Sequence, residues 1–170
     1  MKTVNISAVL WIGVFTCNLS FAQKKEPVTK VSLQASGLTC SMCSNAINKS
    51  LKTVDFVDKV DADIKTSTFE ITFRPGHKVD FDKLKKKVED AGFFVSKFIA
   101  FIDFKNVQVK ADEPVTIGTI TLRFLNVKDH VMDGEKPIRI IDKGFISSKE
   151  YKKTPINSPI PGTRIYNATI

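Results

Sequence analysis

Short segments of this chain alternate between hydrophobic and polar residues with two different periods. A period of two is typical of a half-buried strand, and a period of about four is typical of an amphipathic helix. Taken in order, the segments are strand, helix, strand, strand, helix and strand at residues 29–35, 41–52, 57–64, 69–73, 81–91 and 93–104. This order predicts a split β-α-β fold over residues 28–100, with an antiparallel sheet and two helices on one face.

The residues at the ends of these segments support the same order. Gly37 interrupts the first strand, and the hydroxyl of Ser41 can cap the helix that follows. Asp80 is a suitable cap for the second helix. Gly92, which can adopt positive φ, ends that helix.

The remaining residues, 101–170, have a different pattern. Short alternating or apolar segments at residues 107–109, 115–124, 137–141 and 145–146 are separated by turns rich in Gly, Pro and Asp, and no long helical period appears. They predict a small all-β domain, a sandwich or barrel of five or six strands. The predicted class is therefore α+β, with a ferredoxin-like domain at 28–100 that has its own core and a second domain at 101–170.

The amino-terminal residues have the pattern of a secretory signal peptide. Lys2 precedes an apolar stretch, and Ser20-Phe21-Ala22 has the small-x-small form of a cleavage site. Residues 1–22 are expected to be removed, which predicts a secreted or periplasmic protein without stable membrane insertion. Two alternatives are a retained membrane anchor and a lipid attached to Cys17.

Two cysteines lie three positions apart, where the first predicted helix begins. Cys40 and Cys43 can direct both sulfurs to one point, and the positive end of the helix favours thiolate over thiol. Adjacent thiolates suit Cu(I), and also Zn(II), Cd(II) or Hg(II). The alternative is a thiol-disulfide oxidoreductase that uses the same pair. Only these two cysteines remain after signal cleavage, so a fold held by several disulfides is excluded.

The loop Gly37-Leu38-Thr39-Cys40-Ser41-Met42-Cys43, the order of elements and the segment Glu89-Asp90-Ala91-Gly92-Phe93 resemble the heavy-metal-associated domain family. This family includes copper chaperones, periplasmic mercury-binding proteins and modules of metal-transporting ATPases. The resemblance implies that Cys40 and Cys43 bind the metal and that Phe93 lies near it. Thr39 is similar to the residue of copper-type loops. Leu38 replaces the usual methionine and is expected to pack beneath the loop.

Other sulfur and imidazole groups are weaker candidates for metal ligands. His130 and Met132, in a predicted loop between Asp129 and Asp133, could form a second soft site, although a solvated turn explains them as well. Met42 could supply a thioether, but an outward docking contact is the expected role. His77 is interpreted as a turn residue.

The charge pattern bears on partners. The chain has 26 Lys and Arg residues against 18 Asp and Glu residues, and Lys83-Leu84-Lys85-Lys86-Lys87 concentrates four of them. Such a helix face is usually only solvated, but it could also attract an acidic metal-donating or metal-accepting domain. A signal peptide argues against nucleic acid, and no set of catalytic residues is evident. The sequence therefore predicts a non-enzymatic carrier or scavenger of a soft metal, most favourably Cu(I).

Overall fold

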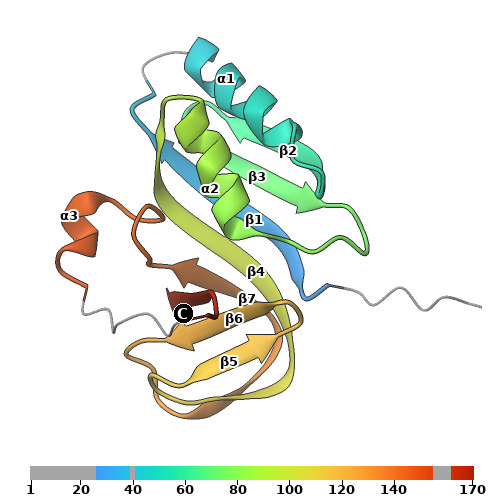
Figure 1. Ribbon diagram of the computed structural model, residues 1–170, viewed down its shortest axis with the longest axis vertical. Helices are drawn as coiled ribbons and strands as arrows, with labels where there is room; N and C mark the ends of the chain where they lie inside the picture. Colours follow the sequence, from blue (N-terminus) through green and yellow to red (C-terminus); the bar gives the residue numbers. More distant parts are fainter. Residues whose placement is uncertain (1–25, 39–40, 155–161) are drawn as a thin grey trace, which may run out of the picture.

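The computed structural model describes residues 26–38, 41–154 and 162–170, and in these residues one eight-stranded sheet carries the two longer helices on one face (Figure 1). The elements are β1 (Val28–Ser36), α1 (Ser41–Lys52), β2 (Val57–Asp63), β3 (Thr68–Phe73), α2 (Phe81–Asp90), β4 (Phe94–Val109), β5 (Pro114–Ile117), β6 (Ile120–Phe124), β7 (His130–Ile140), α3 (Ser148–Tyr151) and β8 (Ile165–Thr169). The strand order is β2-β3-β1-β4-β7-β8-β6-β5.

Both helices begin and end close to where the sequence predicts. The side chain of Asp80 accepts a hydrogen bond from the Lys83 N–H at 3.2 Å and so caps α2. Gly92 follows α2 with a φ of +88°, which a residue without Cβ adopts without strain. Helix α1 begins at Ser41 itself, so Ser41 is its first residue and not the residue before it.

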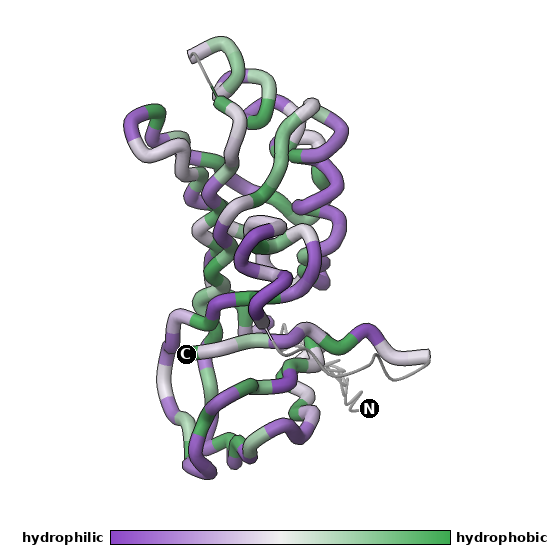
Figure 2. The backbone as a smooth tube through the Cα atoms, turned by 90° about the vertical axis from the view of Figure 1, so that its left-hand side faces the viewer, coloured by the Kyte–Doolittle hydropathy of each residue, from purple (hydrophilic) through white to green (hydrophobic). Residues whose placement is uncertain are grey.

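The first four strands form the predicted ferredoxin-like arrangement. In β2-β3-β1-β4 all neighbours are antiparallel, and Val31 of β1 lies between Ile71 of β3 and Ala100 of β4. These three side chains are fully buried, as are Ile47 of α1 and Leu84 of α2. Hydrophobic and hydrophilic residues alternate along the strands and helices (Figure 2), and the hydrophobic ones form the core between sheet and helices.

Strand β4 is longer than predicted and crosses the expected boundary between residues 100 and 101. It has 16 residues and pairs with β1 along its first part and with β7 along most of its length. An irregularity between Phe104 and Val107 contains Asn106, at a φ of +50°. The Asn106 N–H is satisfied by the Asp133 carboxylate at 3.2 Å. The predicted break after Phe104 is therefore a bulge within one strand.

The prediction of a separate all-β domain after residue 100 is not confirmed. Strands β5 to β8 continue the same sheet, and the helical turn α3 follows β7. The predicted strand at residues 145–146 is wrong, because Phe145 lies in a turn and its ring is fully buried. Strand β8 was not predicted, since the residues from Ile165 to Ala168 are all buried and do not alternate.

The two parts of the chain share one hydrophobic core. A four-ring set, which we call the junction cluster, consists of Phe81 of α2, Phe98 of β4, Phe145 after β7 and Tyr166 of β8. The Phe98 ring lies 5.0 Å from the Phe81 ring and 5.1 Å from the Phe145 ring, and Phe81 is 5.1 Å from Tyr166 between centroids. Such tilted and edge-to-face pairs contribute about 0.5–1.5 kcal/mol each beyond the burial of their area.

A polar network beside the junction cluster also joins the two parts. Arg164 donates to both carboxylate oxygens of Asp82, at 2.6 and 3.2 Å, and to Asp142 at 2.9 Å. The Tyr166 hydroxyl donates to Asp82 at 3.1 Å. The buried Asp142 carboxylate accepts from the backbone and the side chain of Asn167, at 3.2 and 2.7 Å. This pairing explains why a polar residue, Asn167, can lie inside a buried strand.

The charge of Arg164 determines the ionisation of Asp82. Partial burial alone would raise the pKa of the Asp82 carboxyl. The hydrogen bond and the positive charge of Arg164, with smaller effects of Lys85 and Tyr166, outweigh burial and hold that pKa below its ordinary value of 3.8. Burial and the neighbouring Asp82 carboxylate raise the pKa of Tyr166, so the hydroxyl keeps its proton and remains a donor.

The shared core predicts that the two parts unfold together. The whole chain is expected to show one cooperative transition in denaturant, and a fragment of residues 28–100 to be much less stable, because Phe81 and Phe98 lose the rings of Phe145 and Tyr166. A fragment extended to the end of β4 would not serve as a control, because it would still lack β7 and β8. Phe98→Leu in the whole chain is the matched test of the ring contacts. A fragment that unfolds at the same midpoint as the whole chain would instead support two independent domains.

The Asp82–Arg164 pair predicts a specific pH dependence of stability. Asp82→Asn is expected to lower the free energy of unfolding at pH 7 by about 1 kcal/mol, a value reduced for solvent screening because the carboxylate is partly exposed. A depressed carboxyl pKa contributes stability above its ordinary value of 3.8 that is lost as the pH falls through the folded pKa. The difference between the two proteins should therefore shrink below pH 3.8. Asp90→Asn, which removes the exposed Lys86–Asp90 pair on the same helix, is the control. A difference that is constant from pH 7 to pH 2 would contradict the assignment.

Candidate metal centre

The cysteine loop joins the end of β1 to the start of α1. Cys43 is the third residue of α1 and is half-buried in its first turn. Cys40 and Thr39 lie outside the described residues. The first turn of α1 contains no acidic residue, so no carboxylate within it opposes the positive end of the helix. This position favours the thiolate form of Cys43.

The start of β4 supports the chain just before the loop. Gly37 has a φ of +88°, and a Cβ added there would lie 3.8 Å from Cδ1 of Phe93. The Ser36 hydroxyl donates to the Phe94 carbonyl at 3.4 Å. Leu38 packs against the main core, as predicted for the residue beneath the loop. Phe93 therefore lies beside Gly37, the residue at which the loop begins.

Two large apolar side chains near the ends of these elements face solvent. Met42 of α1 is 80% exposed, which agrees with an outward contact residue. Phe94 is 69% exposed, and sequence reasoning did not single it out. The sequence contained a signal for the exposure of Phe94, because consecutive residues of a strand point to opposite faces. Val95, the next residue of β4, is buried at 3% exposure, so Phe94 points to the opposite face.

The expected loop containing His130 and Met132 is a strand. Both residues belong to β7, where Met132 is 2% exposed and packs in the core. The His130 side chain is exposed, and its Nδ1 lies 2.7 Å from the Lys128 carbonyl oxygen. His77 is a turn residue, as expected, with Nδ1 3.2 Å from the Pro75 carbonyl oxygen. The described residues contain no group of three or more His, Cys, Asp or Glu side chains that could hold a metal.

Comparison with known proteins agrees with this geometry. Residues 32–94 match the family model of the heavy-metal-associated domain. The mercuric transport protein periplasmic component of Pseudomonas fluorescens is 40% identical over 63 residues, which are 37% of this chain and 68% of that protein. A probable copper-transporting ATPase of Arabidopsis thaliana is 30% identical over 71 residues, 42% of this chain but only 7% of the ATPase.

Among solved structures, oxidized MerP from Ralstonia metallidurans CH34 is 35% identical and matches 41% of this chain and 94% of its own, with a TM-score of 0.37. The match in sequence to the periplasmic mercury protein extends over more than two thirds of that protein. The family-model match at residues 32–94 includes the loop between β1 and α1 and both longer helices, α1 and α2. The chain belongs to the heavy-metal-associated family through residues 32–94.

Proposed function

We propose that this protein is a non-enzymatic carrier of Cu(I) outside the cytoplasm, with Cys40 and Cys43 as the metal ligands. The observation that carries the proposal is the position of Cys43 in the first turn of α1, inside the segment that matches the heavy-metal-associated domain. Cys40, three residues earlier, is taken as its partner from the sequence. Two thiolates bind a soft ion tightly.

The same ligand set explains how the ion could leave. A metal held by two sulfurs at the surface has open coordination positions, so thiolates of a partner can attack it and replace the first pair one at a time. Met42 is exposed beside Cys43 and provides an apolar contact for such a partner. The protein therefore needs no catalytic residue, because ligand exchange is driven by the relative affinities of the two sites.

Copper is favoured over zinc by Thr39 in the loop, which is similar to the residue of copper-type loops, whereas zinc-type loops often carry an acidic residue at this position. Similarity to the relatives supports copper and mercury equally, since the relatives include a copper-transporting ATPase and a mercuric transport protein. Zinc and cadmium are the remaining candidates for two thiolates. The relatives give no support to the alternative, a thiol-disulfide oxidoreductase.

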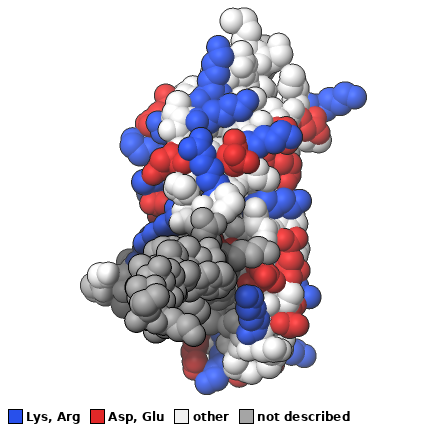
Figure 3. Space-filling model, turned by 90° about the vertical axis from the view of Figure 1, so that its right-hand side faces the viewer, with Lys and Arg blue, Asp and Glu red and all other residues white. Residues whose placement is uncertain are grey.

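The basic side chains on the helices support an acidic partner domain. Helices α1 and α2 lie side by side, with the Ser50 hydroxyl donating to the Lys87 carbonyl at 2.8 Å. Lys83 and Lys86 lie near Asp55 and Asp90, so part of this charge is balanced within the molecule. Basic and acidic groups are accordingly interspersed on the face shown in Figure 3. A metal-transfer rate that falls with added salt would support steering by the lysines, and a salt-independent rate would contradict it.

The proposal that the protein is exported depends on the sequence alone, since residues 1–22 lie outside the described residues. Among the residues that are described, every helix is too short or too polar to cross a membrane. The mercuric transport relative is periplasmic by its name. Amino-terminal sequencing of the exported protein should begin at Gln23; a chain that retains Lys2, or a lipid on Cys17, would contradict this proposal.

Replacement of either cysteine tests the metal site. The reduced chain is expected to bind one Cu(I), and Cys40→Ser or Cys43→Ser should lower the affinity by orders of magnitude, because a hydroxyl is a hard and poorly ionised ligand. Titration against a competing Cu(I) chelator measures this change, and a parallel titration with Hg(II) separates the two metals. Met42→Leu, which keeps an apolar side chain next to Cys43, is the matched control.

A disulfide-reductase assay of the same variants separates the carrier from the oxidoreductase. The carrier should show no turnover. In an oxidoreductase the first cysteine attacks, so Cys43→Ser would accumulate a mixed disulfide through Cys40. Turnover without uptake of either metal would contradict the proposed function. Far-ultraviolet circular dichroism should be unchanged in both serine variants, since Cys43 is only half-buried at the end of a helix.

A further inference from the structure

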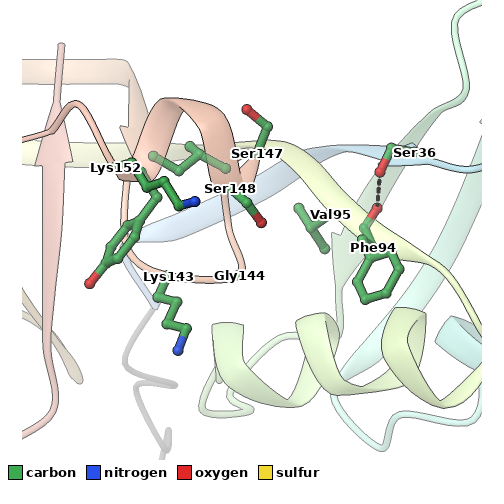
Figure 4. A pocket seen from close by; sticks show the side chains of 10 residues that line it. Ser36, Phe94, Val95, Lys143, Gly144, Ser147, Ser148 and Lys152 are labelled. Atoms are coloured by element: carbon green, nitrogen blue, oxygen red, sulfur yellow. Dashed lines mark hydrogen bonds between the residues drawn. The ribbon is translucent and has the colours of Figure 1, made fainter.

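A hollow of about 560 Å³ lies between the carboxyl-terminal part of the chain and the junction of β1 with β4. One wall is the segment from Lys143 to Lys152, which includes α3, and the other is formed by Ser36, Phe94 and Val95 (Figure 4). The first wall lies outside the segment that matches the heavy-metal-associated domain. The hollow is thus built from both parts of the chain, and the described residues that line it include neither of the proposed metal ligands.

The lining is mostly apolar on the side of the sheet. Phe94 presents a ring that is 69% exposed, and the buried side chain of Val95 lies next to it. Ile146 and Tyr151, which pack together in a small second core, line the opposite side. An exposed aromatic ring facing an apolar floor provides a surface for a ligand with an apolar body.

The polar groups of the hollow are donors. Lys143 and Lys152 both line it, and in the part of the chain that the structure describes neither forms an ion pair. The Ser147 hydroxyl oxygen accepts from the Glu150 N–H at 3.2 Å, and its proton can still be donated. Two ammonium groups and a hydroxyl favour a negatively charged ligand.

The nearby carboxylates do not cancel this charge. Glu150 pairs with Arg139 at 2.8 Å, and Asp142 pairs with Arg164 at 2.9 Å. On the side of α2, the side chains of Lys85 and Glu89 both approach Gly144, and Lys85 also pairs with Asp82 at 3.5 Å, so Glu89 leaves the two lysines of the hollow in excess by one charge. The hollow therefore combines an apolar lining with an excess of positive charge, a pattern typical of a site for a small amphipathic anion.

We propose that this hollow binds a small organic carboxylate with an apolar body, the carboxylate between Lys143 and Lys152 and the body against Phe94. The volume lies within the range of about 300–1,000 Å³ that small-molecule sites occupy. The proposal goes beyond the proposed metal carrier and stands independently of it, because none of these side chains is a metal ligand.

Three probes test the proposal on the whole, reduced, metal-free chain by two-dimensional ¹H–¹⁵N NMR titration. N-acetyl-L-phenylalanine has both the carboxylate and the apolar body. Its neutral amide lacks the charge, and acetate lacks the body. N-acetyl-L-phenylalanine should give saturable shifts in residues 143–152 and 94–95, with a dissociation constant at least about tenfold lower than either control probe.

Variants of exposed residues locate the site without affecting the fold. Lys143→Ala, Lys152→Ala and Phe94→Ala should each weaken N-acetyl-L-phenylalanine binding by about tenfold. Lys149→Ala and Lys153→Ala remove exposed lysines in or next to this segment that do not line the hollow, and they should leave the affinity within about twofold.

Several results would overturn the proposal. The first is equal affinity for N-acetyl-L-phenylalanine and its amide. The second is the absence of a saturable NMR shift up to about 10 mM N-acetyl-L-phenylalanine. The third is that the NMR shifts persist in the Phe94, Lys143 and Lys152 variants. Saturable binding of an acidic peptide such as acetyl-Asp-Phe-Asp-Glu-amide without binding of N-acetyl-L-phenylalanine would assign the hollow to docking of a protein segment instead. The metal titrations are unaffected by all of these outcomes, so the two proposals fail separately.

Discussion

The pairing of β4 with two neighbouring strands at once holds this molecule together. Its backbone forms an antiparallel ladder with β1 on one edge and with β7 on the other. Because the two ladders overlap from Ile99 to Ile102, the same residues belong to the metal-binding fold and to the carboxyl-terminal part. A break in β4 would expose backbone groups on both sides, and the bulge at Asn106 avoids this by bonding to Asp133.

Side-chain packing reinforces that continuity. Phe98 of β4 contacts Phe81 from the metal-binding fold and Phe145 from the carboxyl-terminal part, so one ring fills both sides of the junction. The Arg164–Asp82 pair lies beside these rings and joins β8 to α2. A protein interior is close-packed, so a shift of β8 would be transmitted to α2 through these contacts. The carboxyl-terminal part thus acts as a rigid extension of the metal-binding fold.

The same continuity determines what surrounds the cysteine loop. The first residues of β4 bring Phe93 against the core beside Gly37 and leave Phe94 exposed on the opposite face. The segment after β7 packs Phe145 against Phe98 and brings Gly144 beside α2, and its residues Lys143 and Lys152 line the hollow. The start of β4 therefore contributes both to the surroundings of the cysteine loop and to the lining of the hollow.

The sequence alone determined the elements that depend on local interactions. The apolar spacing from Ser41 to Lys52, the Asp80 cap and Gly92 fix both long helices, because capping and helical periodicity involve residues only a few positions apart. The spacing of Cys40 and Cys43 likewise indicated the candidate site without any knowledge of distant contacts.

Only the tertiary structure decided the rest. Strand β8 is buried on both faces, and the side-chain amide of its Asn167 donates to the distant Asp142. The sequence predicts Met132 in a loop, but Met132 is a core residue because β7 pairs with β4. The hollow joins residues 36, 94 and 143, which no local pattern connects, because long-range pairing of strands brings them together.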